Sequence, residues 1–325
     1  MVKKVLLRRP NQFQIKFSFI TKNVKENFMF KKNKRFIIGP DSAISLSANG
    51  GTEVIAKYLV DKYNFRTLSL VKAKSYNKSK LCNSEVIFVG CPIYDYLFLS
   101  WKLRKNNVSI NLLIVYGKKN LFTFIKELII YISKFIFSTS IINLLGKQNT
   151  YLLKSNLRLN PYLIAERNIK NKFPNYHLND FNKREFVFGY IGRICAKKGF
   201  YKALDLSEFI TNNGYEIFFD VLTFKEEGYL NQNSKVKMIF NNKKLNLPPK
   251  YNQIQYLILP YSSISSSICI PLVPLEAAIM GCRVILPKFM ESLYLEIFSI
   301  NVKLKDAFIF TEDYNLTIKQ IIFEK

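Results

Sequence analysis

The sequence is poor in histidine, in paired cysteines and in acidic residues. Each shortage limits the kinds of catalytic or metal site that the protein can have. Its 325 residues include one histidine, His177, so neither a histidine-based catalytic triad nor a metal site with several histidines is expected. The five cysteines show no paired or metal-ligand spacing, and their odd number fits a reduced, cytosolic chain. Glycine and proline are few and follow no repeat, which excludes collagen-like, low-complexity and solenoid proteins.

Long hydrophobic runs are also missing. The most apolar segment covers residues 128–145, but Lys134 interrupts it, and its Ser and Thr residues weaken it as a membrane span. We interpret it as a buried helix that runs into a buried strand, with an interfacial helix as the alternative. The N-terminal segment begins like a signal peptide, yet its apolar run ends at Arg8, Arg9 and Pro10, which leaves no long apolar core.

Positive charge is what the sequence has in excess. Lysine and arginine number 49 against 23 acidic residues, which gives a formal net charge of +26. Such a charge predicts attraction to polyanions: nucleic acid, anionic lipid or phosphorylated small molecules. The alternative explanation is an AT-rich genome, because the abundant Lys, Asn, Ile, Phe and Tyr have A/T-rich codons. Residues 1–34 mix cations with Phe and Ile, and we predict a basic extension there that forms a strand or hairpin.

Short apolar runs alternate with helix-like segments along the rest of the chain. Runs such as 35–40 and 186–192 read as buried strands, and helical spacing follows them. This alternation is typical of parallel α/β sheets covered by helices on both faces. We predict two Rossmann-like, doubly wound domains, residues 35–165 and 166–325, with a polar linker region around 156–185 and a cleft between the domains.

A cationic loop follows the first strand of the second predicted domain. The stretch GYIGRICAKKGF, residues 189–200, places Arg193 and Lys198 where a strand ends and a helix begins. A guanidinium, an ammonium and the amides of a helix N-terminus form an arrangement that binds diphosphate. The stretch is neither a Walker loop nor the dinucleotide GxGxxG motif. Solvated charges on an ordinary loop are the alternative.

Two further stretches suggest contacts with a sugar or nucleotide. In ICIPLVPLEAAIMGCRVILP, residues 268–287, Glu276 lies in a short helix that ends at Gly281, and a carboxylate there could accept both hydroxyls of a ribose. In the opening loop of the first domain, Gly50 and Gly51 let the backbone approach a phosphate or sugar, and Glu53 follows. A surface glutamate and a flexible turn are the respective alternatives.

Taken in order, these stretches resemble the GT-B glycosyltransferases of the retaining family four, often called glycosyl transferases group 1. The pattern Gly-Gly-x-Glu is matched by Gly50, Gly51 and Glu53. The pattern Gly-Arg-Leu-x-x-x-Lys-Gly is matched by residues 192–199, with isoleucine at the leucine position. A Leu-Glu-Ala stretch that ends in Gly-x-Pro-Val-Ile is matched by Leu275, Glu276, Ala277, Gly281, Val284 and Ile285. The resemblance covers most of the chain from residue 35 onward and is weak between residues 64 and 154.

The resemblance implies the GT-B architecture, with a nucleotide-sugar donor in residues 166–325 and a glycan or lipid-linked acceptor held largely by residues 35–165. Arg193 and Lys198 would hold the donor diphosphate and stabilise the leaving nucleotide, with no metal ion and no cofactor. Glu276 would bind the ribose. The donor-binding residues implied are Gly192, Arg193, Lys198, Gly199, Ser267, Pro271, Leu272 and Glu276.

The sequence departs from the family pattern in both domains. Ile268 stands where the family usually has a glutamate, and an isoleucine cannot bind a sugar hydroxyl. A serine at 265–267 could substitute in part, or the donor could differ, or activity could be reduced. The histidine that the family often has in its N-terminal domain has no counterpart here. Asp95, after a predicted strand, is the nearest candidate catalytic residue, with a helix N-cap as the alternative.

Three functions follow from these observations. The first is a metal-independent, retaining glycosyltransferase of cell-surface glycan synthesis, cytoplasmic and held at the inner face of an anionic membrane by the basic extension. The second is a GT-B homologue that binds nucleotide or a partner subunit without catalysis, suggested by Ile268. The third is a nucleic-acid-binding protein, suggested by the net charge. No motif that reads nucleic acid is present, so the first function carries no nucleic-acid partner.

Overall fold

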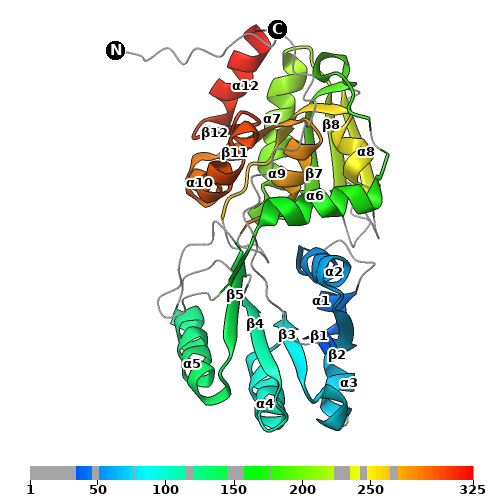
Figure 1. The fold of residues 1–325 in the computed structure, drawn as a ribbon. Coiled ribbons are helices and arrows are strands. Elements are labelled where there is room, and N and C mark those ends of the chain that lie inside the picture. Colours follow the sequence, from blue (N-terminus) through cyan, green and yellow to red (C-terminus); the bar gives the residue numbers. More distant parts are fainter. Residues whose placement is uncertain are drawn as a thin grey trace.

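The computed structural model describes most of the chain beyond residue 33. The described residues are 34–45, 51–76, 78–114, 121–144, 157–175, 177–222, 235–241, 247–263 and 270–324. Within these ranges the chain forms two parallel six-stranded sheets, which occupy the lower and upper halves of Figure 1. The basic extension predicted at residues 1–34 lies outside the described residues except for Lys34.

The first sheet has the strand order β2-β1-β3-β4-β5-β6. Its strands are β1 (Lys34–Gly39), β2 (Arg66–Ser69), β3 (Ser84–Val89), β4 (Ser109–Ile114), β5 (Ser140–Leu144) and β6 (Leu157–Leu159). The helices between them are α1 (Asp41–Ile44), α2 (Gly51–Tyr63), α3 (Leu70–Ser75), η1 (Lys78–Leu81), α4 (Ile93–Leu103) and α5 (Leu121–Phe137). Right-handed crossovers place α3, α4 and α5 on one face and α2 on the other, because the step from β1 to β2 runs opposite to the later steps.

The second sheet has the strand order β12-β11-β10-β7-β8-β9. Its strands are β7 (Phe186–Arg193), β8 (Ile217–Leu222), β9 (Val236–Asn241), β10 (Ile254–Ile258), β11 (Arg283–Pro287) and β12 (Phe308–Thr311). The helices of this half are η2 (Phe181–Lys183), η3 (Ala196–Lys198), α7 (Phe200–Asn212), α8 (Leu247–Tyr251), α9 (Leu272–Ile279), η4 (Lys288–Met290), α10 (Glu291–Ile300), α11 (Val302–Lys305) and α12 (Tyr314–Phe323). We call the two halves the first lobe and the second lobe.

Helix α6 (Pro161–Lys172) connects the two lobes. Asn160 caps its start by accepting a hydrogen bond from the Tyr162 amide at 2.9 Å, and Pro161 occupies the first helical turn. The prediction of two doubly wound α/β domains is confirmed as a fold class. The predicted boundary between residues 165 and 166 falls within α6.

Successive strand residues of the first sheet face different apolar clusters. Ile37 belongs to the cluster on the α2 side, whereas Ile38 belongs to the cluster that includes Tyr96 of α4. The α2-side cluster continues through Ile164 and Ile169 of α6 into the second lobe. One continuous apolar core therefore joins the two lobes.

Of the predicted segment 128–145, the described residues up to 144 form a helix followed by a strand, as predicted, but the outer face of the helix is exposed. Phe135 on α5 is 69% exposed and Ile136 is 58% exposed, so the prediction of a buried helix is wrong. Apolar composition alone predicts burial, but these apolar side chains of α5 face outward. Among the described residues, none of the helices has both the length and the apolar character that crossing a bilayer requires.

Gly199 allows two segments of the second lobe to approach closely. Its φ of 75° lies in the left-handed region, and a Cβ placed on it would lie 2.0 Å from the carbonyl oxygen of Pro260. The residue sits between η3 and α7, directly after Lys198. Only glycine can therefore hold this loop against the segment that follows β10.

We predict that Gly199→Ala lowers the free energy of unfolding by roughly 3–5 kcal/mol. The added methyl group would clash with the backbone carbonyl of Pro260, and alanine is also strained in the left-handed conformation. Gly214→Ala is the matched control: its φ is 90°, but nothing lies within 4 Å of the added Cβ. It should cost only about 1 kcal/mol. Urea unfolding followed by circular dichroism compares the two, and equal losses would contradict the close approach at Gly199.

Candidate functional site

Arg193 and Lys198 lie together at the carboxyl edge of β7. Arg193 is the last residue of β7 and is exposed, and Lys198, at the end of η3, is half-buried. The hydroxyl of Tyr190 donates to the carbonyl oxygens of Arg193 at 3.2 Å and of Lys198 at 3.3 Å. These two bonds close the loop between the cations and fix both ends of it.

The environment of Lys198 disfavours its positive charge. Burial, and after it the nearby guanidinium of Arg193, together lower the pKa of its ammonium to about 8. A cation held partly out of water beside another cation is unfavourable at neutral pH unless an anion joins them. The pair is therefore suited to binding a phosphate group.

Tyr261 lies between this cation pair and Glu276, the predicted ribose-binding residue. The Lys198 Nζ atom lies 5.2 Å from the centre of the Tyr261 ring. Tyr261 is buried, and burial followed by the charge of Glu276 raises the pKa of its hydroxyl. Tyr261 thus neighbours both Lys198 and Glu276, which brings the two predicted donor residues to one side chain.

Glu276 is buried in α9 and accepts two hydrogen bonds. Its Oε1 atom accepts from Asn168 Nδ2 of α6 at 2.6 Å, and its Oε2 atom accepts from the Tyr251 hydroxyl of α8 at 3.2 Å. Burial raises the pKa of the carboxyl group, while Lys172, Asn168 and Tyr251 act in the opposite direction. A carboxylate has about four lone-pair positions, so these two donors do not exhaust its capacity to accept.

The buried guanidinium of Arg184 holds the C-terminal end of α9 in place. It donates to the carbonyl oxygens of Met280 and Ile254, both at 2.8 Å, and to that of Tyr251 at 3.3 Å. The turn after α9 passes so close that a Cβ at Gly281 would lie 2.6 Å from this guanidinium. At the other end, Pro271 occupies the N-cap position of α9 and Leu272 begins the helix, both buried.

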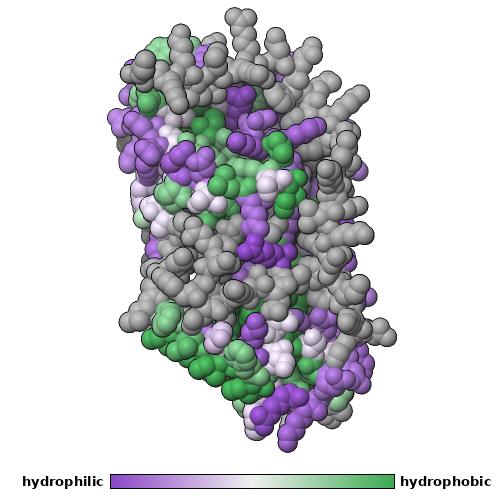
Figure 2. All heavy atoms as spheres, turned by 60° about the vertical axis from the view of Figure 1, so that its left-hand side comes forward, coloured by the Kyte–Doolittle hydropathy of each residue, from purple (hydrophilic) through white to green (hydrophobic). Residues whose placement is uncertain are grey.

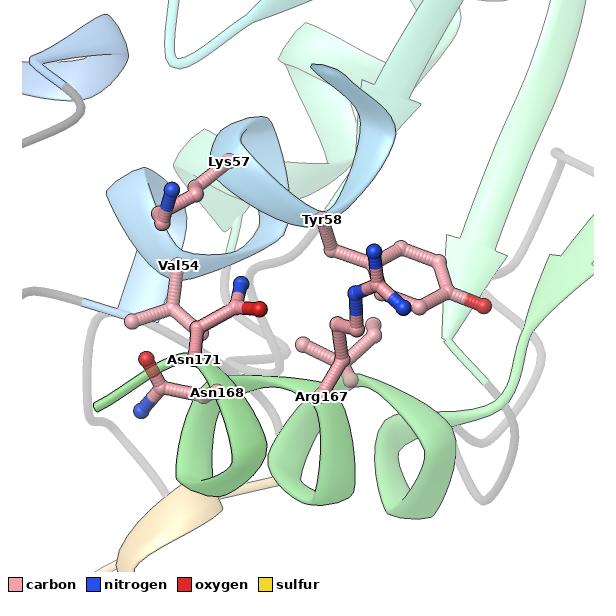
Figure 3. A pocket seen from close by; sticks show the side chains of 7 residues that line it. Val54, Lys57, Tyr58, Arg167, Asn168 and Asn171 are labelled. Carbon is pink, nitrogen blue, oxygen red and sulfur yellow. The ribbon is translucent and has the colours of Figure 1, made fainter. Parts of the chain in front are cut away.

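Helices α2 and α6 bound a recess where the two lobes meet. Figure 3 shows side chains from α2 facing side chains from α6 across it. The recess encloses about 160 Å³ of empty space, part of it open to solvent, and its lining residues are Val54, Lys57, Tyr58, Ile164, Arg167, Asn168 and Asn171. Beside it, Asn171 Nδ2 of α6 donates to Asp61 Oδ2 of α2 at 2.6 Å. Asn168 therefore belongs to the recess and to the contact with Glu276.

The other predicted residues are divided between the lobes. Gly51 is the first residue of α2 and Glu53 lies in its first turn, where the helix passes Gly90 at the end of β3. Asp95 lies in the first turn of α4, almost fully buried, and pairs with Lys74 Nζ of α3 at 2.5 Å. Gly192 lies within β7. Two predicted site residues, Gly50 and Ser267, lie outside the described residues, as does Ile268.

Three contact residues of this site were not predicted from the sequence: Tyr251, Tyr261 and Asn168. Tyr261 follows strand β10 after a proline, at the edge where parallel strands place ligands, and this position could have singled it out. Asn168 is separated from Glu276 by 108 residues, and nothing in the local pattern links them. In the described ranges, no group of three or more His, Cys, Asp or Glu side chains is placed to hold a metal ion.

Comparison with solved structures finds several that resemble the chain in fold. An α-glucosyltransferase in complex with UDP and a 13-mer DNA containing an HMU base has a TM-score of 0.53 and 12% identity, covering 90% of this chain and 99% of that one. A trehalose 6-phosphate synthase from Burkholderia multivorans has a TM-score of 0.45 and 8% identity, covering 84% and 89%. The T4 phage BGT in complex with UDP-glucose has a TM-score of 0.43 and 11% identity, covering 90% and 93%.

The first of these likenesses establishes the GT-B fold. No protein-family model matches the chain. No curated protein matches it in sequence. Structural similarity therefore identifies the fold, while the assignment to family four stays a prediction.

We predict that Arg193→Gln raises the pKa of Lys198 above about 8, because it removes the neighbouring positive charge. The pKa should stay below 10.5, since burial, the larger cause, remains. Nuclear magnetic resonance of the labelled lysine side chains across a pH series measures it. The matched control is Lys197→Gln, which removes an exposed cation from the same loop; a shift as large as that of Arg193→Gln would show that the two cations are not specifically paired.

Proposed function

We propose that the protein is a glycosyltransferase that moves a sugar from a nucleoside diphosphate to a glycan or lipid-linked acceptor, with retention of configuration. The observation that carries the proposal is the cation pair of Arg193 and Lys198 at the carboxyl edge of β7. In open α/β sheets this edge is where ligands bind. A donor diphosphate there would satisfy both cations at once.

The cation pair would act on the bond that breaks. When the sugar leaves, negative charge develops on the terminal phosphate of the nucleotide, and fixed cations stabilise that charge without reorganisation. Lys198 would gain most, because an anion beside it reverses the penalty that lowers its pKa. This scheme assigns no step to a metal ion, and transfer that persists in EDTA would agree with it.

Glu276 would bind the ribose through its remaining lone pairs. It already accepts from Asn168 and Tyr251, which orient its carboxylate. Ser267 would contribute a further contact in the proposal, and Ile268 in place of the usual glutamate would make the sugar site less polar. A homologue that binds nucleotide without transfer is the alternative that Ile268 favours, and activity that appears only in Ile268→Glu would support it.

The first lobe would hold the acceptor, with residues 35–165 as acceptor domain and residues 166–325 as donor domain. Gly51 and Glu53 lie in the first turn of α2, which passes Gly90 directly after β3 at the carboxyl edge of the first sheet. Asp95 remains a prediction for this lobe, and it would have to exchange Lys74 for a sugar. A cytoplasmic location at the inner face of a membrane completes the proposal.

Nucleic acid is the second candidate acceptor, favoured by the net charge of +26. The α-glucosyltransferase with a similar fold is in complex with DNA. Binding to DNA that falls steeply with added salt would indicate phosphate contacts, and transfer to DNA would replace the glycan acceptor. Absence of DNA binding at physiological salt would remove this candidate.

We predict that Arg193→Ala and Lys198→Ala each weaken binding of the donor nucleotide by about 10–100-fold, because each removes a charge-assisted hydrogen bond to phosphate. Affinity of the native protein should fall as the pH rises through about 8, where Lys198 loses its proton. Calorimetry with UDP, GDP and dTDP measures both effects, and Lys197→Ala is the control. A chain that neither binds nor turns over any of these nucleotides or their sugars would end the proposal.

We predict that Glu276→Gln reduces discrimination between ribose and deoxyribose in the nucleotide, because a neutral amide oxygen accepts a weaker hydrogen bond than a carboxylate does. The native protein should bind the ribonucleotide more tightly than its 2′-deoxy analogue, because the carboxylate accepts from the hydroxyl. In Glu276→Gln the two affinities should become more similar. If Glu276 only orders α6, α8 and α9, both affinities will fall together and their ratio will not change.

A further inference from the structure

Helix α5 presents an apolar face to the outside of the first lobe. Its exposed large apolar residues recur at helical spacing: Phe124, Ile125, Leu128, Tyr131, Ile132, Phe135 and Ile136. The helix lies at the outer side of the lobe in Figure 1, and Figure 2, which turns this side forward, shows apolar side chains gathered over the lower part of the molecule. Exposed apolar patches of this kind mark interaction surfaces.

The inward face of α5 is partly polar, which inverts the usual pattern of a surface helix. Glu127 is 1% exposed and Ser133 is 2% exposed. The hydroxyl of Ser133 lies 3.0 Å from that of Tyr96 in α4, which in turn donates to Thr139. Packing against the sheet therefore does not account for the apolar residues that face outward.

Neighbouring helices extend this face. Tyr94, Phe98 and Trp101 follow one another at helical spacing on α4, and they are 65%, 49% and 55% exposed. Val71 of α3 is 74% exposed. Eleven of the nineteen exposed large apolar side chains in the described residues belong to α3, α4 and α5. We call these eleven residues the apolar face.

The charge around the apolar face has one sign. Residues 66–137 contain three acidic residues, Glu85, Asp95 and Glu127, and all three are buried. Exposed cations of the same segment are Arg66, Lys72, Lys74, Lys80, Arg104 and Lys105. Two of the cations touch the aromatic residues directly: Lys74 Nζ lies 5.6 Å from the Tyr94 ring centre, and the Arg104 guanidinium lies 5.6 Å from that of Trp101.

We propose that the apolar face docks on an anionic lipid membrane, with α4 and α5 lying in the interface. Apolar side chains beside cations, with tryptophan and tyrosine among them, are the composition that binds this region of a bilayer. Anionic headgroups would attract the cations, while the side chains of α5 enter the boundary of the acyl chains. The inference deepens the proposed function, since it names the surface that brings a lipid-linked acceptor to the first lobe.

A second copy of the chain fits this face less well. A two-fold contact would place the same cations opposite one another, and residues 66–137 offer no exposed carboxylate to pair with them. An anionic surface instead complements every charge on the face. Charge complementarity therefore selects the membrane as the occupant.

Vesicle binding of the full chain tests the inference without donor or acceptor, so its failure and the failure of glycosyl transfer are separate results. Vesicles of phosphatidylcholine alone are compared with vesicles that also contain phosphatidylglycerol. We expect co-sedimentation with the anionic vesicles, and a roughly tenfold or larger loss of affinity in the double variant Ile132→Ser with Phe135→Ser. Arg104→Gln with Lys105→Gln should weaken binding to the anionic vesicles only.

The matched control is Leu316→Ser with Phe323→Ser on α12, where the two side chains are 55% and 75% exposed, close to the 52% and 69% of Ile132 and Phe135. It should bind as the native chain does. Trp101 is the only tryptophan, so quenching of its fluorescence by brominated acyl chains reports contact at this face. The inference is overturned by absence of vesicle binding, by binding that leaves Trp101 unquenched, or by a lipid-free dimer that the α5 variant abolishes.

Discussion

A buried carboxylate with two hydrogen-bond donors is the contact on which the arrangement of the lobes depends. Glu276 of α9 holds Asn168 of α6 and Tyr251 of α8, and α6 in turn packs against α2 of the first lobe. A buried carboxylate is costly unless such donors satisfy it, so the three helices must stay together while it is charged. The helix that connects the lobes is thereby attached to the helix that carries the predicted ribose contact.

The electrostatics of the two lobes differ in character. In the second lobe, Arg193 and Lys198 stand close together, and the penalty on Lys198 is one that a bound anion would relieve. In the first lobe, the acidic residues between 66 and 137 are all withdrawn into the interior, where Asp95 pairs with Lys74. Among the described residues, cations therefore gather at two places: the pair of Arg193 and Lys198, which we propose binds phosphate, and the broad surface beside the apolar face.

The fold could be predicted from the sequence because each strand of a parallel α/β sheet has a recognisable local sequence pattern. Each buried strand is a short apolar run, and Arg193 could be placed at the edge of the sheet because it directly follows such a run. The hydrogen-bond partners of Glu276 could not be predicted in this way, because Asn168 and Tyr251 belong to other helices. The outward face of α5 was mistaken for a buried one, because hydrophobicity alone does not state which side of a helix meets the sheet. The burial of Glu127 and Ser133 shows that the more polar side of α5 packs inward.

The Arg184 clamp has a consequence for how the second lobe responds to acid. Its hydrogen bonds go to the carbonyl oxygens of Tyr251, Ile254 and Met280, which have no proton to gain as the pH falls. Acidification should therefore leave the turn behind α9 attached, whereas Glu276 of the same helix, whose pKa is raised by burial, gains a proton.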